Sequence, residues 1–138
     1  MLPTEVTVEE FTTPDPVTAT EDMSIDDLRL LMDEYGIRHL PVVRGDTVVG
    51  VISDRDVRLV SGLSLAEKHQ VRASDIMAPN PLTVSANARL DEVAYAMSEK
   101  KVGSAIVLDT NGKLLGIFTA TDALNALIEV VRGDNASS

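Results

Sequence analysis

The chain has 138 residues, of which 44% are hydrophobic and 3% aromatic, and 22 acidic against 12 basic side chains give it a formal net charge of −10. This length fits one domain or two small ones, and the apolar fraction is that of a globular protein. The absence of cysteine excludes disulfides and thiolate-held zinc or iron–sulfur sites. We see no run of about 18 apolar residues and no signal-peptide pattern, so we expect a soluble, cytoplasmic protein with no membrane partner.

The negative charge is concentrated at the start of the chain. Residues 1–34 hold ten acidic residues and one arginine, whereas the rest of the chain is nearly neutral. Nucleic-acid backbones are bound by clustered Lys and Arg, which this composition lacks. Nucleic acid is therefore an unlikely class of partner on sequence grounds.

Two copies of one pattern account for most of the chain. Residues 14–18 read Pro-Asp-Pro-Val-Thr and residues 79–83 read Pro-Asn-Pro-Leu-Thr, an offset of 65. The same offset aligns the apolar and acidic positions that follow. After a one-residue slip in a turn, an offset of 66 aligns residues 50–56 with residues 116–122. We therefore predict an internal repeat.

Each copy alternates strand and helix patterns in the order β-α-β-β-α. In the first copy a helix with apolar residues at helical spacing begins after Ser24, its predicted N-cap, and ends at Gly36. Strand patterns, rich in β-branched residues, lie at residues 17–19, 37–43 and 48–53 in the first copy and at residues 102–108 and 114–119 in the second. A second helix is expected after each strand pair. About 45–50 residues are too few to cover both faces of a three-stranded sheet, so the copies should pack on each other.

In both copies the last strand ends in Gly-apolar-apolar-Ser/Thr-x-x-Asp and runs into a helix. The hydroxyl of Ser53 or Thr119, together with the free amides of the helix start, forms a small anion site. Asp56 or Asp122, three residues later, suits the vicinal hydroxyls of a ribose, as an acidic residue does in dinucleotide-binding folds. Alternatively these residues only cap their helices. Capping is expected to explain one polar residue per helix start, but not the spacing of both.

Together, these strings make residues 10–131 resemble a tandem pair of CBS (cystathionine β-synthase) domains. The match rests on residues 16–18 with 81–83, on residues 38–43 with 103–107, and on the two helix-start strings. The resemblance implies an α/β (α+β) fold of two βαββα repeats with pseudo-two-fold symmetry, and a cleft between them that binds adenosine nucleotides or related adenosyl ligands. It also implies frequent dimerisation into a flat disc and a regulatory rather than catalytic role.

The expected boundaries follow from the repeat. They are a flexible N-terminal tail at residues 1–9, repeat 1 at residues 10–60, a linker at residues 61–74, repeat 2 at residues 75–131 and a flexible C-terminal tail at residues 132–138.

Carried over position by position, the resemblance places the ribose-binding carboxylates at Asp56 and Asp122. The backbone around Thr18 and Thr83, and the start of the following strand in each copy, would meet the adenine. The first site then comprises Val17, Thr18, Arg38, His39, Leu40, Pro41, Ser53, Arg55 and Asp56. The second site comprises Leu82, Thr83, Ser104, Ala105, Ile106, Thr119 and Asp122. The second copy departs from the pattern at Ile106, where the first has Pro41, and this weakens the expected adenine contacts there.

The two candidate sites also differ in charge. The basic positions of the first copy become neutral in the second: Arg38, His39, Arg55 and Arg58 align with Gly103, Ser104, Thr121 and Leu124. Because guanidinium groups bind phosphate oxygens through paired donors, we expect the first site to prefer AMP, ADP or ATP. The second site would be weaker or take a less charged adenosyl group; S-adenosylmethionine and NAD are further candidate ligands. Alternatively the arginines form surface ion pairs with Asp33, Glu34 or Asp54, which contribute little.

The leading functional hypothesis is a stand-alone ligand-sensing module, expected to be a homodimer, that transmits binding of an adenosine nucleotide to an unidentified effector protein. A structural dimerisation module with no physiological ligand is the alternative. A small enzyme is the least favoured class, because no nucleophile lies in a recognisable relation to a general base and no phosphate-loop string occurs. His39 and His69 are the only histidines, and without cysteine they cannot build a zinc site alone. We therefore expect no catalytic residue, no metal site and no catalytic cofactor.

Overall fold

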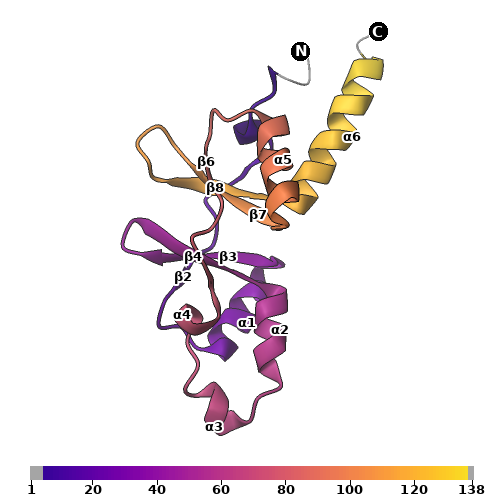
Figure 1. The fold of residues 1–138 in the computed structure, drawn as a ribbon. Helices are drawn as coiled ribbons and strands as arrows, with labels where there is room; N and C mark the ends of the chain where they lie inside the picture. The colour runs from indigo at the N-terminus through magenta and orange to yellow at the C-terminus, as the bar shows by residue number, and fades with distance from the viewer. Residues whose placement is uncertain (1–4, 137–138) are drawn as a thin grey trace. The chain divides into compact units, whose positions relative to one another are not determined.

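The computed structural model describes residues 5–136, and the side chains of residues 5–133. These residues form two compact units (Figure 1). The repeat 1 unit is Pro16–Pro81, and the repeat 2 unit joins the described residues before Pro16 to those after Pro81. Each unit has its own four-stranded sheet and its own buried core. Among the helices of this part of the chain, none has the length and apolar character needed to cross a membrane.

The repeat 1 unit has the predicted β-α-β-β-α order. Its elements are β2 (Ala19–Thr20), α1 (Ile25–Tyr35), β3 (His39–Arg44), β4 (Thr47–Ser53), α2 (Asp54–Ser61), α3 (Leu65–Lys68), α4 (Ala73–Ile76) and β5 (Ala78–Pro79). The sheet order is β2-β3-β4-β5, with β2 parallel to β3 and the other neighbours antiparallel. Leu40, Val42 and Ile52 of the sheet pack in one core with Leu28 of α1 and Val57 of α2. The helices therefore cover one face of the sheet.

Helix α1 begins and ends where the sequence predicts. Ser24 Oγ accepts a hydrogen bond from the backbone N–H of Asp27 at 3.1 Å. Gly36 follows the helix in the left-handed conformation, with φ of 61°, which glycine adopts without steric cost. Ile25 and Leu28 are buried in the core, so the apolar side of the helix faces the sheet.

The repeat 2 unit repeats this architecture. Its elements are η2 (Val8–Phe11, a 3₁₀ helix), β1 (Thr13–Pro14), β6 (Thr83–Ser85), α5 (Leu90–Lys100), β7 (Ser104–Leu108), β8 (Leu114–Thr119) and α6 (Ala120–Ala136). The sheet order is β1-β8-β7-β6, with β6 parallel to β7 and the other neighbours antiparallel. Its core combines Val8, Val93, Val107 and Phe118. The two sheets thus match strand for strand.

Each sheet is completed by a strand that the sequence assigns to the other copy. β1 lies within the expected repeat 1 but pairs with β8, and β5 lies within the expected repeat 2 but pairs with β4. The chain passes between the units just after these strands, at Asp15 and Asn80, whose φ values are 48° and 54°. Asp and Asn tolerate this left-handed conformation better than most residues. The Pro-x-Pro strings are therefore the points at which the chain changes units.

The glycine of each helix-start string is required by this strand pairing. Gly116 lies opposite Pro14 of β1, and a Cβ there would clash with the backbone carbonyl of Thr13. Gly50 lies opposite β5, and a Cβ there would stand 2.5 Å from Met77 Sδ and 3.0 Å from a backbone oxygen of that strand. A glycine inside a strand often marks such a close backbone approach.

The ends and the linker differ from the expected boundaries. Val6 and Val8 are buried, and the Val8 N–H donates to the Ala88 carbonyl at 2.8 Å, so residues 5–9 pack on the repeat 2 unit instead of forming a tail. The apolar side chains at alternate positions, Val6 and Val8, explain this packing. α6 continues to Ala136, beyond the expected end at residue 131, and the expected linker contains α3 and the start of α4. Residues 1–4 and 137–138 of the expected tails lie outside the described residues.

Candidate functional site

The helix-start string of repeat 1 forms a reciprocal capping box. The backbone N–H of Asp56 donates to Ser53 Oγ at 3.2 Å, and the backbone N–H of Ser53 donates to Asp56 Oδ2 at 2.9 Å. Two amides that have no partner within the helix are satisfied in this way. Ser53 and Asp56 are both half-buried at the junction of β4 and α2.

The string of repeat 2 forms the same arrangement. The Thr119 N–H donates to Asp122 Oδ2 at 2.9 Å, and the Asp122 N–H lies 3.3 Å from Thr119 Oγ1. The Thr119 hydroxyl also donates to Asp122 Oδ2 at 3.1 Å. The four residues that carry the sequence motif therefore have one common structure at two places in the chain.

The capping boxes change what the repeated string indicates about a ligand, against the expectation that capping explains only one polar residue per helix start. A capping box explains both polar residues and their spacing of three, so the repetition of the string is not by itself a sign of a ligand. The capping boxes nevertheless leave one carboxylate oxygen of each aspartate available to a ligand. In both boxes the hydrogen bonds of the carboxylate use Oδ2, and an ionised carboxylate has about four acceptor positions on its two oxygens. Oδ1 of Asp56 or Asp122 can therefore accept from a ligand without breaking the cap.

Strand alternation decides which predicted residues can present a side chain near these caps. His39 lies directly opposite Ser53 in the β3–β4 register, and residues directly opposite share a face of the sheet. Leu40 lies on the other face, in the core with α1 and α2, so only its backbone is available. In repeat 2, Ser104 lies opposite Thr119 and is buried, and Ala105 belongs to the core. The His39 side chain therefore lies on the face of the sheet that carries Ser53, whereas the side chains of Leu40 and Ala105 lie in the cores and cannot contact a ligand there.

The two repeats differ in their backbone where the first strand of each begins. In repeat 2 the Ile106 N–H donates to the Leu82 carbonyl at 2.8 Å, and β6 starts at Thr83, opposite Ile106. The corresponding donor in repeat 1 would be residue 41, which is proline and has no N–H. β2 accordingly starts one position later, at Ala19, opposite Val42.

The Val17 carbonyl is left open by this difference. No hydrogen bond joins it to another described residue. Val17 and Pro41 stand at the edge where β2 and β3 begin and β4 ends, which is the edge that carries Ser53. The difference between Pro41 and Ile106 is visible in the sequence. The open carbonyl is not, because it depends on the parallel pairing of β2 with β3.

His39 is perturbed by its position on this edge. Burial lowers the pKa of the His39 imidazole below its ordinary value, while the carboxylates of Asp54 and Asp56 act in the opposite direction and Arg38 adds to the lowering. Burial disfavours the charged form of a histidine. The ring is therefore held in its neutral form near neutral pH, where one ring nitrogen donates and the other accepts hydrogen bonds.

The basic side chains of repeat 1 differ in what they contact. Arg38 and Arg58 line a groove between α1 and α2. Arg58 also approaches Asp54 at 3.9 Å in an exposed pair of the kind that contributes little. Arg55 is exposed in the first turn of α2, next to Asp56, and forms no hydrogen bond or ion pair with the described residues. Arg55, next to Asp56 of the cap, is therefore available to a phosphate.

The remaining predicted residues lie near the same two edges. Thr18 is half-buried just before β2, and Thr83 is exposed at the start of β6. Leu82 packs against the repeat 2 core, so its side chain is engaged within its own unit.

Both repeats of the chain are similar to a known protein family. A family model described as CBS domain matches residues 8–61 and 73–129. A CBS domain-containing protein of Dictyostelium discoideum is 32% identical over 137 residues, covering 92% of this chain and 94% of that protein. Inosine-5′-monophosphate dehydrogenase of Korarchaeum cryptofilum is 34% identical over 114 residues, but the match covers 83% of this chain and only 23% of the enzyme.

Solved structures show the same fold. CBSX2 in complex with AMP has a TM-score of 0.78 and 31% identity, covering 91% of this chain and 98% of that one; CBSX2 is an Arabidopsis thaliana protein. The CBS domain of the bacterial CNNM/CorC family Mg²⁺ transporter, in complex with ATP, has a TM-score of 0.82 and 26% identity, covering 91% and 89%. Since the family model spans both units, the chain belongs to the CBS domain family and carries a pair of CBS repeats.

Proposed function

We propose that the chain is a non-catalytic sensor module that binds an adenosine nucleotide at the repeat 1 edge and passes this state to a partner protein. The observation that carries the proposal is the open Val17 carbonyl at the edge that also holds the free oxygen of Asp56. Two proteins of the same fold, at 31% and 26% identity, are known in complex with AMP and with ATP. AMP, ADP and ATP are the leading ligands, and S-adenosylmethionine or NAD are further candidates.

Each group at this edge has a specific part in the proposed complex. The Val17 carbonyl accepts a hydrogen bond from the amino group of adenine. Oδ1 of Asp56 accepts from the ribose hydroxyls, while Oδ2 keeps its bond to the Ser53 amide. The Ser53 hydroxyl accepts from the Asp56 amide and retains a proton to donate to a phosphate. Arg55 supplies the charge that neutralises the phosphate.

The repeat 2 edge offers a poorer version of the same site. Its strand-start carbonyl is already bonded to the Ile106 N–H, and Thr121 stands where repeat 1 has Arg55. Asp122 and Thr119 remain able to hold a ribose, since their capping box matches that of repeat 1. We therefore assign phosphate-bearing nucleotides to repeat 1, and weak binding or a less charged adenosyl ligand to repeat 2.

The proposed partners are a second copy of the chain and an effector protein that reads the ligand state. Ligand control requires that the ligand bind two states of the module with different affinity. The competing function is a structural dimerisation module with no physiological ligand. A cytoplasmic location is part of the proposal, since adenosine nucleotides and effector proteins are both available there.

A ligand panel in a thermal unfolding assay tests this function. AMP, ATP, S-adenosylmethionine and NADH are added to the wild-type chain and to the matched variants Asp56→Asn and Asp122→Asn. A ligand at about 100 times its dissociation constant stabilises by about 2.7 kcal/mol, and each kcal/mol shifts the midpoint of a domain of this size by about 2–8 °C. We expect AMP or ATP to raise the midpoint of the wild type and of Asp122→Asn, but much less that of Asp56→Asn. No shift with any of the four ligands would favour the structural module.

A further inference from the structure

The α1–α2 groove of the repeat 1 unit has an apolar floor. Its volume is about 420 Å³, and small-molecule clefts usually measure about 300–1000 Å³. Met32 of α1 and Val57 of α2 line the groove and are only 5% and 3% exposed. Ile37, which follows α1, also lines it and packs against the same core. The floor therefore offers apolar contact to a small aliphatic group.

Both walls of the groove are charged along the rim. α1 contributes Arg29 and Asp33, which are four residues apart. α2 contributes Asp54 and Arg58, which have the same separation. Residues four apart lie on the same side of a helix, about 6 Å from each other along its axis. Each wall therefore carries one acid and one base.

The packing of the two helices places like charges at the same end of the groove. The backbone N–H of Asp54 donates to the Arg38 carbonyl at 2.8 Å, so the start of α2 lies next to the chain that leaves the end of α1. Because α1 and α2 pack side by side, Asp33 and Asp54 lie toward this end, where Arg38 also lines the groove. Arg29 and Arg58 lie one turn farther along their helices. The two aspartates are therefore at one end of the groove, and these two arginines are at the other.

The rim charges are only partly neutralised within the chain. Arg29 approaches Asp26 at 3.5 Å, and Arg58 approaches Asp54 at 3.9 Å. Both pairs are exposed, and such pairs contribute little to stability. Asp33 forms no ion pair with another described residue, although Arg29 is four residues away on the same helix. Charged groups of both signs are therefore available to a ligand.

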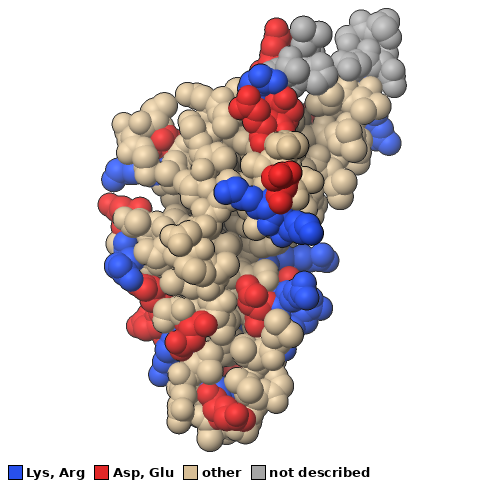
Figure 2. All heavy atoms as spheres, viewed as in Figure 1, with Lys and Arg blue, Asp and Glu red and all other residues tan. Residues whose placement is uncertain are grey.

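The matching place in the repeat 2 unit lacks these charges. A hollow lies there between α5 and α6, and its residues at the four rim positions are uncharged: Ala94, Ser98, Ala120 and Leu124. Lys101, where repeat 1 has Gly36, is its one charged lining residue. On the face shown in Figure 2, acidic and basic side chains both lie over α2 of repeat 1. The fold therefore accounts for a depression between two helices, but not for the charged rim of repeat 1.

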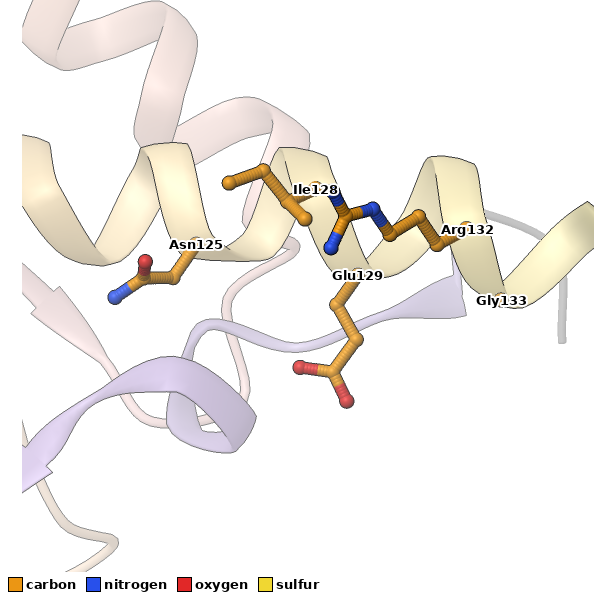
Figure 3. A pocket seen from close by; sticks show the side chains of 5 residues that line it. All are labelled: Asn125, Ile128, Glu129, Arg132 and Gly133. Carbon is orange, nitrogen blue, oxygen red and sulfur yellow. The ribbon is translucent and has the colours of Figure 1, made fainter.

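The hollow along α6 is built differently. Its described lining residues all belong to that one helix: Asn125, Ile128, Glu129, Arg132 and Gly133 (Figure 3). Figure 3 shows the Arg132 side chain running along the helix while Glu129 points away from it. One helix provides no second wall, whereas ligand clefts enclose most of the surface of a small molecule. The α1–α2 groove differs in having two walls with charges of both signs above an apolar floor.

From these observations we infer that the α1–α2 groove binds a free amino acid with an aliphatic side chain. The ammonium group pairs with Asp33 and Asp54, and the carboxylate accepts hydrogen bonds from the guanidinium groups of Arg29 and Arg58. The arginine side chains are long and exposed, so they can bend toward the ligand, and the weak Arg58–Asp54 contact opens on binding. The aliphatic side chain lies on the floor.

A zwitterion suits this groove better than an ion of one sign. A simple cation would meet the arginines at one end, and a simple anion would meet the aspartates at the other. Like charges that face each other across an interface cost free energy, whereas complementary charges fix the orientation of a ligand. The binding of an amino acid here does not require a nucleotide at the repeat 1 edge.

An NMR titration of the isotope-labelled chain with leucine tests this site. Leucinamide lacks the carboxylate and 4-methylpentanoate lacks the ammonium group, but both keep the aliphatic body of leucine. We expect leucine to shift the backbone amides of residues 29–38 and 54–61 and to bind at one site per chain. Each analogue should bind about tenfold more weakly or worse, the scale of one hydrogen bond between charged groups.

Charge variants show whether the rim residues hold the ligand. Asp33→Asn removes a charge from the acidic end, and Arg29→Gln removes one from the basic end. Each should weaken leucine binding by about tenfold or more. Asp27→Asn and Arg132→Gln are matched controls, because both side chains are exposed and lie outside the groove. Circular dichroism checks that all four variants fold.

Three results would overturn the inference. The first is that leucine, up to its solubility limit, leaves the groove amides unshifted or shifts only amides elsewhere. The second is that leucinamide or 4-methylpentanoate binds as tightly as leucine. The third is that the control variants lose as much leucine affinity as Asp33→Asn and Arg29→Gln.

Discussion

Giving residue 41 a backbone N–H tests the proposed role of the Val17 carbonyl. Pro41→Ala supplies the donor that repeat 2 has at Ile106, where the N–H reaches the Leu82 carbonyl at 2.8 Å. The same bond should then form between residue 41 and Val17, extending β2 by one position toward the chain start. The carbonyl that we assign to adenine would be occupied before the ligand arrives.

The expected loss of AMP affinity in Pro41→Ala follows from the free energy of one hydrogen bond. An internal amide–carbonyl bond contributes about 0.5–1.5 kcal/mol net. A ligand that must displace it loses affinity by about two- to tenfold. A ligand that leaves the new bond in place instead loses its own contact with the Val17 carbonyl, which is a loss of the same size. We therefore expect the dissociation constant for AMP to be about two- to tenfold weaker than that of the wild type.

Isothermal titration calorimetry with AMP measures this change, and hydrogen exchange at residue 41 reports whether the new bond forms. Ile106→Val is the matched control, because it changes a buried side chain at the equivalent position and keeps the donor. We expect it to leave AMP affinity within about twofold, since repeat 1 is untouched and distant sites act independently. A protected amide at residue 41 together with unchanged AMP affinity would refute the assignment of the Val17 carbonyl to adenine.

Three further perturbations address the phosphate, the histidine and the strand exchange. Arg55→Ala should weaken AMP binding in calorimetry by about tenfold or more, the scale of a charge-assisted hydrogen bond, whereas Thr121→Ala should change it little; equal losses would contradict the difference between the repeats. Because burial lowers the pKa of His39, the unfolded chain binds a proton there more readily, so the free energy of unfolding should fall as pH drops from about 7 through the ordinary histidine value near 6.5. Urea unfolding at several pH values should show a smaller fall for His39→Gln, and an identical slope would exclude His39 as a source of the pH dependence. Gly116→Ala should cost about 1–3 kcal/mol by forcing β1 away from β8, measured by urea unfolding against Gly62→Ala, where a Cβ meets open space; equal stability of the two variants would argue against the close strand contact.

The order of elements was predictable because it depends on short-range patterns. The strand at Leu114–Thr119 has the predicted bounds, and α1 is capped at Ser24 and followed by Gly36 as expected. Caps, helical periodicity and β-branched runs act over a few residues, so they can be read from the chain directly. The repeat itself is equally local, since it requires only alignment of the sequence with itself.

Contacts between residues that are distant in the sequence could not be predicted in this way. β1 and β5 have two residues each. So short a strand carries no sequence pattern from which its pairing could be predicted, and β1 pairs with β8, about a hundred residues later in the chain. The burial of Val8 and the need for glycine at position 116 both follow from such long-range contacts. The sequence therefore placed the repeat boundaries several residues away from the points where the chain changes units.

The candidate site divides in the same manner. The printed residues alone show that a Ser/Thr-x-x-Asp string follows each last strand and that the basic residues around the first string are neutral in the second. The spatial contacts add that each string closes into a capping box, that Arg38 and Arg58 line the α1–α2 groove, and that Pro41 leaves a carbonyl open. The physical reason is that the availability of a polar atom depends on all its neighbours in space. A sequence specifies the donors and acceptors of a site, and the fold decides which of them are already paired.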